Sequence, residues 1–278
     1  MRRPNAMSAA GEDTVSRFIS RSGRTSRRGS SPNVMPAAMM FMMVAFGFFV
    51  LVVAALSVPV RADPSPPTSL SVLSSGGRQL PAISTSNVSA QGGNVTNVNI
   101  DALTITKSWQ GYYGNVTGNI HLDDANNNSF YIWGNASSLA GEIYASRNNT
   151  IDWGTINCTT GAERSAEDGY LGLSWSDGDS ATNTFNGTIH PGFLVGSQDI
   201  GNNTCYSTTL FVNGTSQNDS FHQILLSDSS GSLVYSTIME DNQYAYNGQT
   251  ADFQLLVGEN EHPSALGPTT YYFFVEIN

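Results

Sequence analysis

The sequence has few charged residues, and lysine is almost missing from it. Charged side chains make up 12% of the 278 residues, the net charge is −10, and Lys107 is the only lysine. Seven of the eleven arginines lie before residue 29, which leaves the chain after residue 62 strongly acidic. A protein that binds nucleic acid needs a basic surface for the phosphates. The composition therefore excludes nucleic acid as the expected partner.

Motifs that build common catalytic and metal sites are also missing. The four histidines are widely spaced, and none belongs to an H-E-x-x-H motif: His121, His190, His222 and His262. Neither a G-x-S-x-G nucleophile elbow nor a glycine-rich phosphate loop occurs. A glycosidase needs two opposed carboxylates, and nothing in the sequence selects such a pair. We expect no catalysis and no cofactor, and a secreted hydrolase is the least supported alternative.

One acidic run leaves a cation site open. Asp177, Asp179 and Asn183 lie within "DGDSATN", and calcium takes several oxygen ligands from a single loop. The run lacks the full spacing and the terminal glutamate of an EF-hand. Because Asp and Asn are also common turn residues, these three positions are weak calcium candidates, with an ordinary turn as the alternative.

Charge is absent altogether from residue 34 to residue 60. This run of apolar residues is long enough to cross a bilayer, for which about 20 residues suffice. The arginines before it predict a cytoplasmic leader over residues 1–33 and a membrane-spanning helix over residues 34–60. Everything after the helix is then expected outside the cell, either anchored to the membrane or released.

Three fates are open for the N-terminal segment. It can stay as an anchor, or it can be a signal peptide cut after Ala62. The third fate follows from "RRGSSPNV", residues 27–34, which resembles the leader of archaeal type IV pilins. That resemblance implies cleavage after Gly29 and a helix that becomes the core of a filament.

Cysteine is scarce, and sequons are plentiful. Cys158 and Cys205 both follow the apolar run, so we expect one disulfide between them, with a catalytic thiol as the alternative. The N-x-S/T sequons predict a heavily glycosylated ectodomain, with Asn-rich turns as the alternative. They fall at Asn87, Asn94, Asn115, Asn127, Asn135, Asn148, Asn157, Asn186, Asn202, Asn213 and Asn218.

No helical period is evident after the apolar run. Residues 61–95 are rich in Pro, Ser and Gly, which predicts a mobile linker that lifts the remainder from the membrane. Residues 96–278 contain short β-branched and aromatic runs separated by turn residues, so the expected fold class is all-β, an antiparallel β-sandwich. The predicted strands include residues 103–109, 129–134, 141–146, 169–175, 207–213, 221–228, 232–239, 251–257 and 270–277.

Pairing and faces can be predicted for some of these strands. Residues 221–228 and 232–239 flank a short loop with Gly231 and should form a hairpin, which residues 251–257 and 270–277 continue. Alternation in the last strand places Tyr271, Phe273, Val275 and Ile277 in the core.

The stretch "SWQGYYGNVTGNIHL", residues 108–122, is the candidate binding surface. Alternation puts Tyr112, Gly114 and Val116 on an inner face, and Trp109, Tyr113 and the sequon Asn115 on an outer, wet face. Trp109 and Tyr113 are therefore the candidate ligand contacts, and the alternative is that a loop or the glycan itself covers them.

The runs "GGNVTNVNI", "WQGYYGNVTGNIHL", "GEIYASR" and "IDWGTINC", with "DFQLLV" and "TYYFFVEI" near the end, resemble a group of archaeal secreted or membrane-anchored proteins. The resemblance implies an archaeal cell-surface protein and assigns no catalytic residue. We expect a glycosylated structural or adhesion protein, pilin-like in one version, whose partners are the membrane and either other copies or surface glycans. The alternative is an extracellular carbohydrate-binding module.

Overall fold

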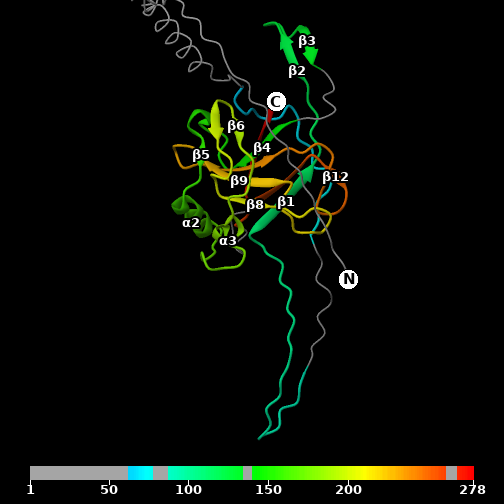
Figure 1. Ribbon diagram of the computed structural model, residues 1–278, viewed down its shortest axis with the longest axis vertical. Coiled ribbons are helices and arrows are strands. Elements are labelled where there is room, and N and C mark those ends of the chain that lie inside the picture. The colour runs from blue at the N-terminus through cyan, green and yellow to red at the C-terminus, as the bar shows by residue number, and fades with distance from the viewer. Residues whose placement is uncertain (1–61, 78–86, 134–139, 261–267) are drawn as a thin grey trace, which may run out of the picture. The chain divides into compact units, whose positions relative to one another are not determined.

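The computed structural model describes residues 62–77, 87–133, 140–260 and 268–278, all within one compact unit, Val58–Asn278. The leader and the apolar helix predicted over residues 1–60 lie outside the described residues. Among the helices that the structure describes, none is long and apolar enough to span a bilayer. The fold is all-β with antiparallel sheets, which confirms the predicted class (Figure 1).

A six-stranded antiparallel sheet forms the centre of the domain. Its strand order is β14-β4-β10-β9-β5, and β8 pairs with β9 as well. The strands are β4 (Gly141–Ser146), β5 (Asn157–Cys158), β8 (Ser207–Thr209), β9 (His222–Ser227), β10 (Leu233–Ile238) and β14 (Tyr272–Ile277). The hairpin of β9 and β10 is the one that Gly231 predicts, and Gly231 has a φ of 81°, which glycine adopts without strain.

Both faces of the central sheet are buried, so neither carries the polar outer face of a simple two-layer sandwich. Side chains alternate between two hydrophobic clusters. Tyr144 in β4 faces the first cluster, whereas its neighbours Ile143 and Ala145 face the second. The first cluster also holds Ile151, Trp153, Ile156, Phe193, Val195, Ile200, Ile224, Leu226, Val234 and Phe274. The second also holds Phe185, Leu225, Tyr235, Met239, Leu255 and Val257.

A second, two-stranded sheet covers the second cluster. It consists of β1 (Trp109–Gly114) and β13 (Phe253–Gly258), paired antiparallel. Gln223 of β9 joins the two sheets, because its buried side-chain amide donates to the carbonyl of Leu256 and accepts from the Leu256 amide. The two bonds resemble those between the main chains of neighbouring strands, but here a side chain makes them.

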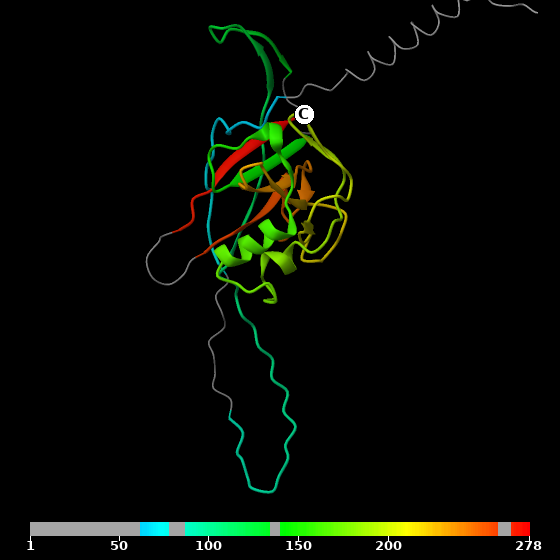
Figure 2. The same ribbon diagram turned by 90° about the vertical axis from the view of Figure 1, so that its left-hand side faces the viewer.

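Smaller pairs of strands and short helices complete the unit (Figures 1 and 2). The strand pairs are β2 (Ile120–Asp123) with β3 (Ser129–Trp133), β6 (Phe193–Val195) with β7 (Gln198–Ile200), and β11 (Gln243–Tyr244) with β12 (Thr250–Ala251). The helices are η1 (Trp153–Thr155), α2 (Gly161–Tyr170) and α3 (Ala181–Thr184).

Helix α2 corrects a prediction, since residues 169–175 were expected as a strand and instead end this helix and form turns. Thr160 and Glu163 form a capping box at its start. The helix buries polar residues: Glu167 is 3% exposed, and Asp168 is 2% exposed and accepts bonds from Thr182 at the start of α3. An inward face made of carboxylates has no apolar period, which is why the sequence pattern did not reveal a helix.

The expected linker is held by the domain at its beginning. Ser65 forms an antiparallel bridge with Val275 of β14 through bonds of 3.1 and 2.9 Å, and Pro64 is buried. After that bridge the described residues up to Lys107 form neither helix nor strand, so the strand predicted over residues 103–109 begins only at Trp109. The carbonyl of Ser108 then accepts a bond from Glu259. The segment from Ser65 to Ser108 is therefore held by the domain at both of its ends.

Two predictions about the C-terminal strands are corrected. β13 pairs with β1, and β14 pairs with β4, so neither continues the β9–β10 hairpin. In β14 the deepest side chains are Phe274 and Glu276, at 5% exposure each, on the face that was predicted to lie away from the core. The predicted core face, with Phe273 and Val275, packs on the second cluster and is half-buried. When both faces of a strand are covered, the alternation of its side chains does not indicate which face is more deeply buried.

Candidate ligand-contact surface

Tyr113 lies on the surface of the β1–β13 sheet. It stands opposite Gln254 in the strand register, and its side chain is 40% exposed. Its ring meets the ring of Tyr246 edge to face, with centroids 5.2 Å apart and planes at 88°. Tyr246 is 50% exposed, so the two rings form one open aromatic surface.

Hydrogen bonds to two other chain segments hold the main chain of Tyr246 in place. Its amide donates to the side-chain carbonyl of Gln254 at 3.0 Å, and its carbonyl accepts from the amide of Gly214 at 2.8 Å. Gln254 is buried and also donates to the carbonyl of Phe211 at 3.0 Å. The aromatic surface is thus held in place by three chain segments before any ligand arrives.

Two exposed amides border the rings. The side-chain nitrogen of Asn247 donates to the hydroxyl of Tyr113 at 3.3 Å and to the side-chain oxygen of Gln249 at 3.2 Å. The side-chain oxygen of Asn247 accepts from the Gln249 amide at 3.1 Å. We call Tyr113, Tyr246, Asn247 and Gln249 the tyrosine patch. It combines aromatic faces with planar amides that both donate and accept hydrogen bonds.

The tyrosine patch carries no formal charge. Partial burial, together with the neighbouring Tyr113, raises the pKa of the Tyr246 phenol above its ordinary value. The phenol is therefore neutral at physiological pH. Gly111 precedes Tyr113 by two residues on the same strand, and a Cβ placed there would meet no atom within 4 Å. The surface of β1 next to Tyr113 is therefore not covered by other described residues at this position.

Trp109, the other predicted contact, lies elsewhere. Its indole nitrogen donates to the carbonyl of Asp179 at 2.6 Å, and its ring packs against Phe185 and Tyr235 with centroids 6.0 and 6.4 Å away. The side chain is half-buried beside the second cluster. Trp109 is thus part of the packing between β1 and the loop before α3, and it does not join Tyr113 on a common surface.

The calcium candidates serve as turn and cap residues. Asp177 accepts from the amide of Ser174 at 2.7 Å, Asp179 accepts from the hydroxyl of Thr106 at 2.6 Å, and the Asn183 side chain donates to the Asp177 carbonyl at 2.7 Å. Within the described part of the chain, no group of three or more His, Cys, Asp or Glu residues is placed to hold a metal ion. These contacts fit the turn alternative.

Every sequon asparagine that the structure describes is exposed, and Asn135 lies outside the described residues. Two of them flank the tyrosine patch. Asn115 directly follows β1, and the amide of Asn213 donates to the carbonyl of Ala245 at 2.9 Å. A glycan on either residue would stand at the border of the patch. Glycosylation itself stays a prediction.

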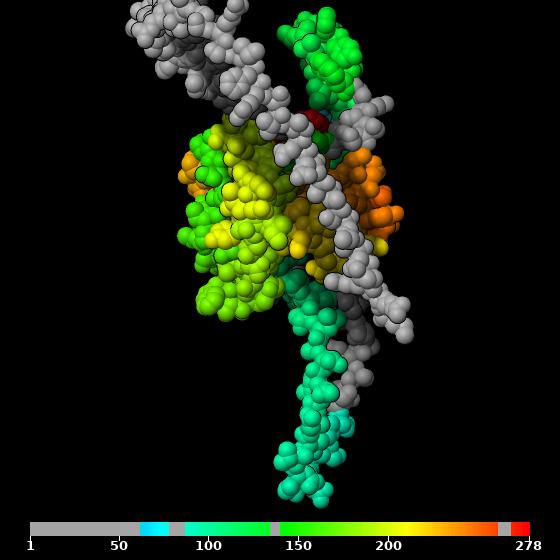
Figure 3. Space-filling model, viewed as in Figure 1, coloured from blue at the N-terminus to red at the C-terminus, as the bar shows by residue number. Residues whose placement is uncertain are grey.

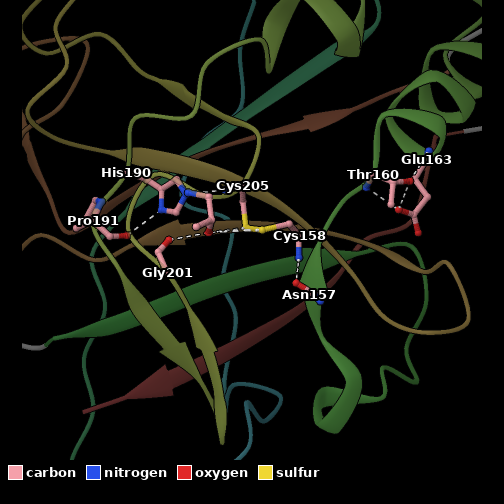
Figure 4. The surroundings of a disulfide bond; sticks show 9 residues. Asn157, Cys158, Thr160, Glu163, His190, Pro191, Gly201 and Cys205 are labelled. Carbon is pink, nitrogen blue, oxygen red and sulfur yellow. Dashed lines mark hydrogen bonds between the residues drawn. A yellow bond between two sulfur atoms is a disulfide. The ribbon is translucent and has the colours of Figure 1, made fainter.

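The disulfide between Cys158 and Cys205 is formed, which confirms that prediction (Figure 4). His190 lies beside it and is 1% exposed. One ring nitrogen, Nδ1, is 2.8 Å from the Pro191 carbonyl, and the other, Nε2, accepts from the amides of Thr204 and Cys205 at 3.1 and 3.0 Å. These contacts require a neutral ring with its proton on Nδ1. Burial lowers the pKa of His190 accordingly.

A buried ion pair near α2 was not predicted at all. Arg147 donates two bonds to Glu167, at 2.6 and 2.5 Å, and the hydroxyl of Tyr235 donates to the same carboxylate at 2.6 Å. Burial alone would lower the pKa of Arg147, but the bonds to Glu167 and its charge outweigh burial and raise it. Burial and the charge of Glu167 raise the pKa of Tyr235. The cluster stabilises the contact of α2 with the central sheet.

The tyrosine patch joins a predicted residue to three that sequence reasoning missed. Tyr246, Asn247 and Gln249 are more than 130 positions from Tyr113, and only the antiparallel register of β1 and β13 brings them close. The run "YAYNGQT" was the available signal, because Asn-Gly marks a tight turn and the flanking tyrosines alternate. Comparisons with protein-family models, curated proteins and solved structures gave no match to this chain.

Proposed function

We propose that this protein is an extracellular surface protein with a structural or adhesive role, and that its domain contacts glycans through the tyrosine patch. The observation that carries the proposal is the exposed Tyr113–Tyr246 ring pair bordered by the amides of Asn247 and Gln249. We propose no catalysis. The membrane is the other partner, through residues 34–60.

The chemistry of the tyrosine patch favours a neutral sugar. The C–H face of a sugar ring packs on an aromatic face, and its hydroxyls need partners that both donate and accept, as Asn and Gln side chains do. The absence of charge among the four patch residues disfavours acidic saccharides and phosphate groups, which call for Arg or Lys. Weak binding at each site is expected, and adhesion would arise from many copies on one surface.

An extracellular location has two supports. The disulfide is of the kind that persists in oxidising compartments. The ten described sequon asparagines are exposed, so each side chain is accessible to a glycosylating enzyme. Both features agree with an N-terminal anchor that leaves the domain outside the cell.

A glycan array with the full chain tests the proposal. We expect binding to neutral oligosaccharides that Tyr246→Ala and Asn247→Ala both abolish. Tyr272→Ala is the matched control, because Tyr272 is 41% exposed on β14, away from the tyrosine patch. Equal binding by all three variants, or binding only to acidic glycans, would reject the proposed contact.

The pilin-like version of the structural role is a second candidate, and the leader "RRGSSPNV" favours it. Sequencing the N-terminus of the mature protein tests it. A terminus at Ser30 supports a filament subunit, and an uncleaved chain supports a simple anchor. A terminus at Asp63 would reject both and leave a secreted domain.

A further inference from the structure

The β2–β3 hairpin presents an apolar face. In its register Ile120 is opposite Trp133 and Leu122 is opposite Tyr131, so these four side chains lie on one side of the hairpin. Each is between 45 and 56% exposed. The rings of Tyr131 and Trp133 contact one another, with centroids 4.9 Å apart. We call Ile120, Leu122, Tyr131 and Trp133 the hairpin face.

The two strands pair only with each other among the described strands. Every residue of β2 and β3 is exposed, and in Figures 1 and 2 the hairpin stands apart from the central sheet. The space-filling view in Figure 3 shows it as the green projection at the top. An isolated two-stranded hairpin is at best marginally stable in water, so a partner surface on the hairpin face would stabilise it.

The turn of the hairpin disfavours insertion into lipid. Asp124 accepts bonds from the amides of Asn126 and Asn128 at 2.8 Å each, and Asp123 lies beside it. The side-chain amide of Asn128 also donates to Asp124, at 2.8 Å, and this bond together with the two main-chain bonds lowers the pKa of Asp124, so it is ionised at neutral pH. Insertion by the tip would bring this charge into hydrocarbon. Asn127, at the tip, is also an exposed sequon.

Charge also argues against a polyanionic partner or anionic headgroups. Residues 108–146 contain neither Lys nor Arg, so the hairpin and its neighbours in sequence carry no cation that could pair with a phosphate. The hairpin face itself is uncharged, and its complement must be an uncharged apolar surface. The hairpin face of another copy has that chemistry.

We infer that the hairpin face binds the hairpin face of a second copy of this chain, across a two-fold axis. Such an isologous contact pairs each apolar side chain with an equivalent one and leaves both polar turns in water. His121, opposite Ile132 on the other side of the hairpin, stays outside the contact.

The size of the hairpin face sets the strength of this contact. Four half-exposed side chains offer about 400 Å² per copy, taking roughly 200 Å² for a large side chain. The total of about 800 Å² is below the roughly 1,000 Å² of a stable specific interface, so only a weak, transient contact is expected from it in solution. We therefore expect a contact that is weak in dilute solution and forms where copies are crowded on one membrane. That crowding rests on the proposed anchor, whereas the contact itself does not.

Cysteine cross-linking of the full chain tests the contact. Both native cysteines are bonded to one another, so a single introduced thiol reports on its own surroundings. Leu122→Cys and Ile120→Cys place the thiol on the hairpin face, and His121→Cys places it on the other side as the matched control. The variants are reconstituted in phosphatidylcholine vesicles at two protein densities, and also oxidised at high concentration in detergent-free buffer after proteolytic release at residues 61–62.

We expect either hairpin-face variant to form a covalent dimer several-fold more than His121→Cys, increasingly so with density, and Trp133→Asp to abolish the dimer. An unchanged thermal midpoint for Trp133→Asp confirms that the domain remains folded. Dimers from the released domain but not from vesicles would support the contact and reject the anchor. Equal cross-linking on both sides of the hairpin overturns the inference. The inference is also overturned if no dimers form and a polarity-sensitive dye on the Leu122→Cys variant reports a lipid environment.

Discussion

At Gly258 three parts of the domain come close together. A Cβ at this position would lie 2.8 Å from a carboxylate oxygen of Glu167, from a methyl carbon of Leu171 and from the hydroxyl of Tyr235. Contacts below 3 Å cannot be accommodated unless a neighbour moves, and two of the neighbours here, Glu167 and Tyr235, belong to the buried ion-pair cluster. The position therefore requires glycine for space and not for its backbone angles.

We predict that Gly258→Ala lowers the free energy of unfolding by about 1–3 kcal/mol, the usual range for overpacking. Gly111→Ala is the matched control, because Gly111 pairs with the same strand and has nothing within 4 Å of its Cβ position. Urea unfolding of both variants provides the measurement. Equal loss in the two variants would contradict the account of this contact.

His190 couples stability to pH. Its pKa is lowered by burial, whereas the unfolded chain has the ordinary value of 6.5. The unfolded state therefore takes up the proton first, and the stability that His190 contributes is complete above pH 6.5. It is lost as the pH falls from 6.5 through the lower pKa of the folded state.

We predict that the unfolding free energy decreases between pH 7.5 and 5 with a component from His190 of at most about 1.4 kcal/mol per pH unit, the value for one proton. His190→Gln is less stable at pH 7.5, because it loses the two accepted amide bonds, but its pH profile is flatter. The same slope in the variant and the native chain would show that another group is responsible.

At the scale of elements, the two sheets meet through a polar bridge. Gln223 is fully buried, and its side chain satisfies both main-chain groups of Leu256. Removing that side chain leaves a donor and an acceptor of β13 without partners in the protein interior. Buried groups of this kind are expensive to leave unpaired.

We predict that Gln223→Ala destabilises the domain by about 2–4 kcal/mol, from two unsatisfied main-chain groups. Gln110→Ala is the control, because Gln110 lies exposed on β1 and its side chain donates to the carbonyl of its neighbour Gly111. Hydrogen exchange of the Leu256 amide should accelerate in the first variant alone. Unchanged exchange there would mean that the bridge does not hold β13.

The sequence predicted best where signals were local. A short loop with Gly231 predicted the β9–β10 hairpin, and two cysteines predicted the disulfide. The partners of β13 and β14 depend on contacts distant in sequence, and local patterns carry no information about them. Helix α2 was not predicted because its buried side chains are carboxylates, although "TGAE" at its start, residues 160–163, is a capping-box signature.

The same distinction holds for the candidate site. Tyr113 followed from alternation along one strand. For Trp109 the structure agrees with the alternative, because the loop before α3 covers the end of β1, and nothing in residues 108–122 identifies that loop. Tyr246 and Asn247 required the tertiary fold.

At the scale of the molecule, the domain is acidic and crosslinked, both faces of its central sheet are buried, and the tyrosine patch and the hairpin face are two separate exposed surfaces. The tyrosine patch is ordered by hydrogen bonds from three segments, whereas the hairpin face lacks any cover from the described residues. The first suits a small polar ligand with an apolar face, and the second suits another copy of the chain. The proposed adhesion and the proposed assembly thus use separate surfaces.

The binding of a neutral sugar at the tyrosine patch is the central claim, and ring signals test it most directly. The chain has eleven tyrosines, which can be labelled with carbon-13 and assigned by substitution. Titration with the best neutral oligosaccharide from the array should shift the ring signals of Tyr113 and Tyr246 and leave that of Tyr272 unchanged. Shifts confined to other tyrosines, or no shift at millimolar sugar, the range of weak single-site binding, would contradict the account.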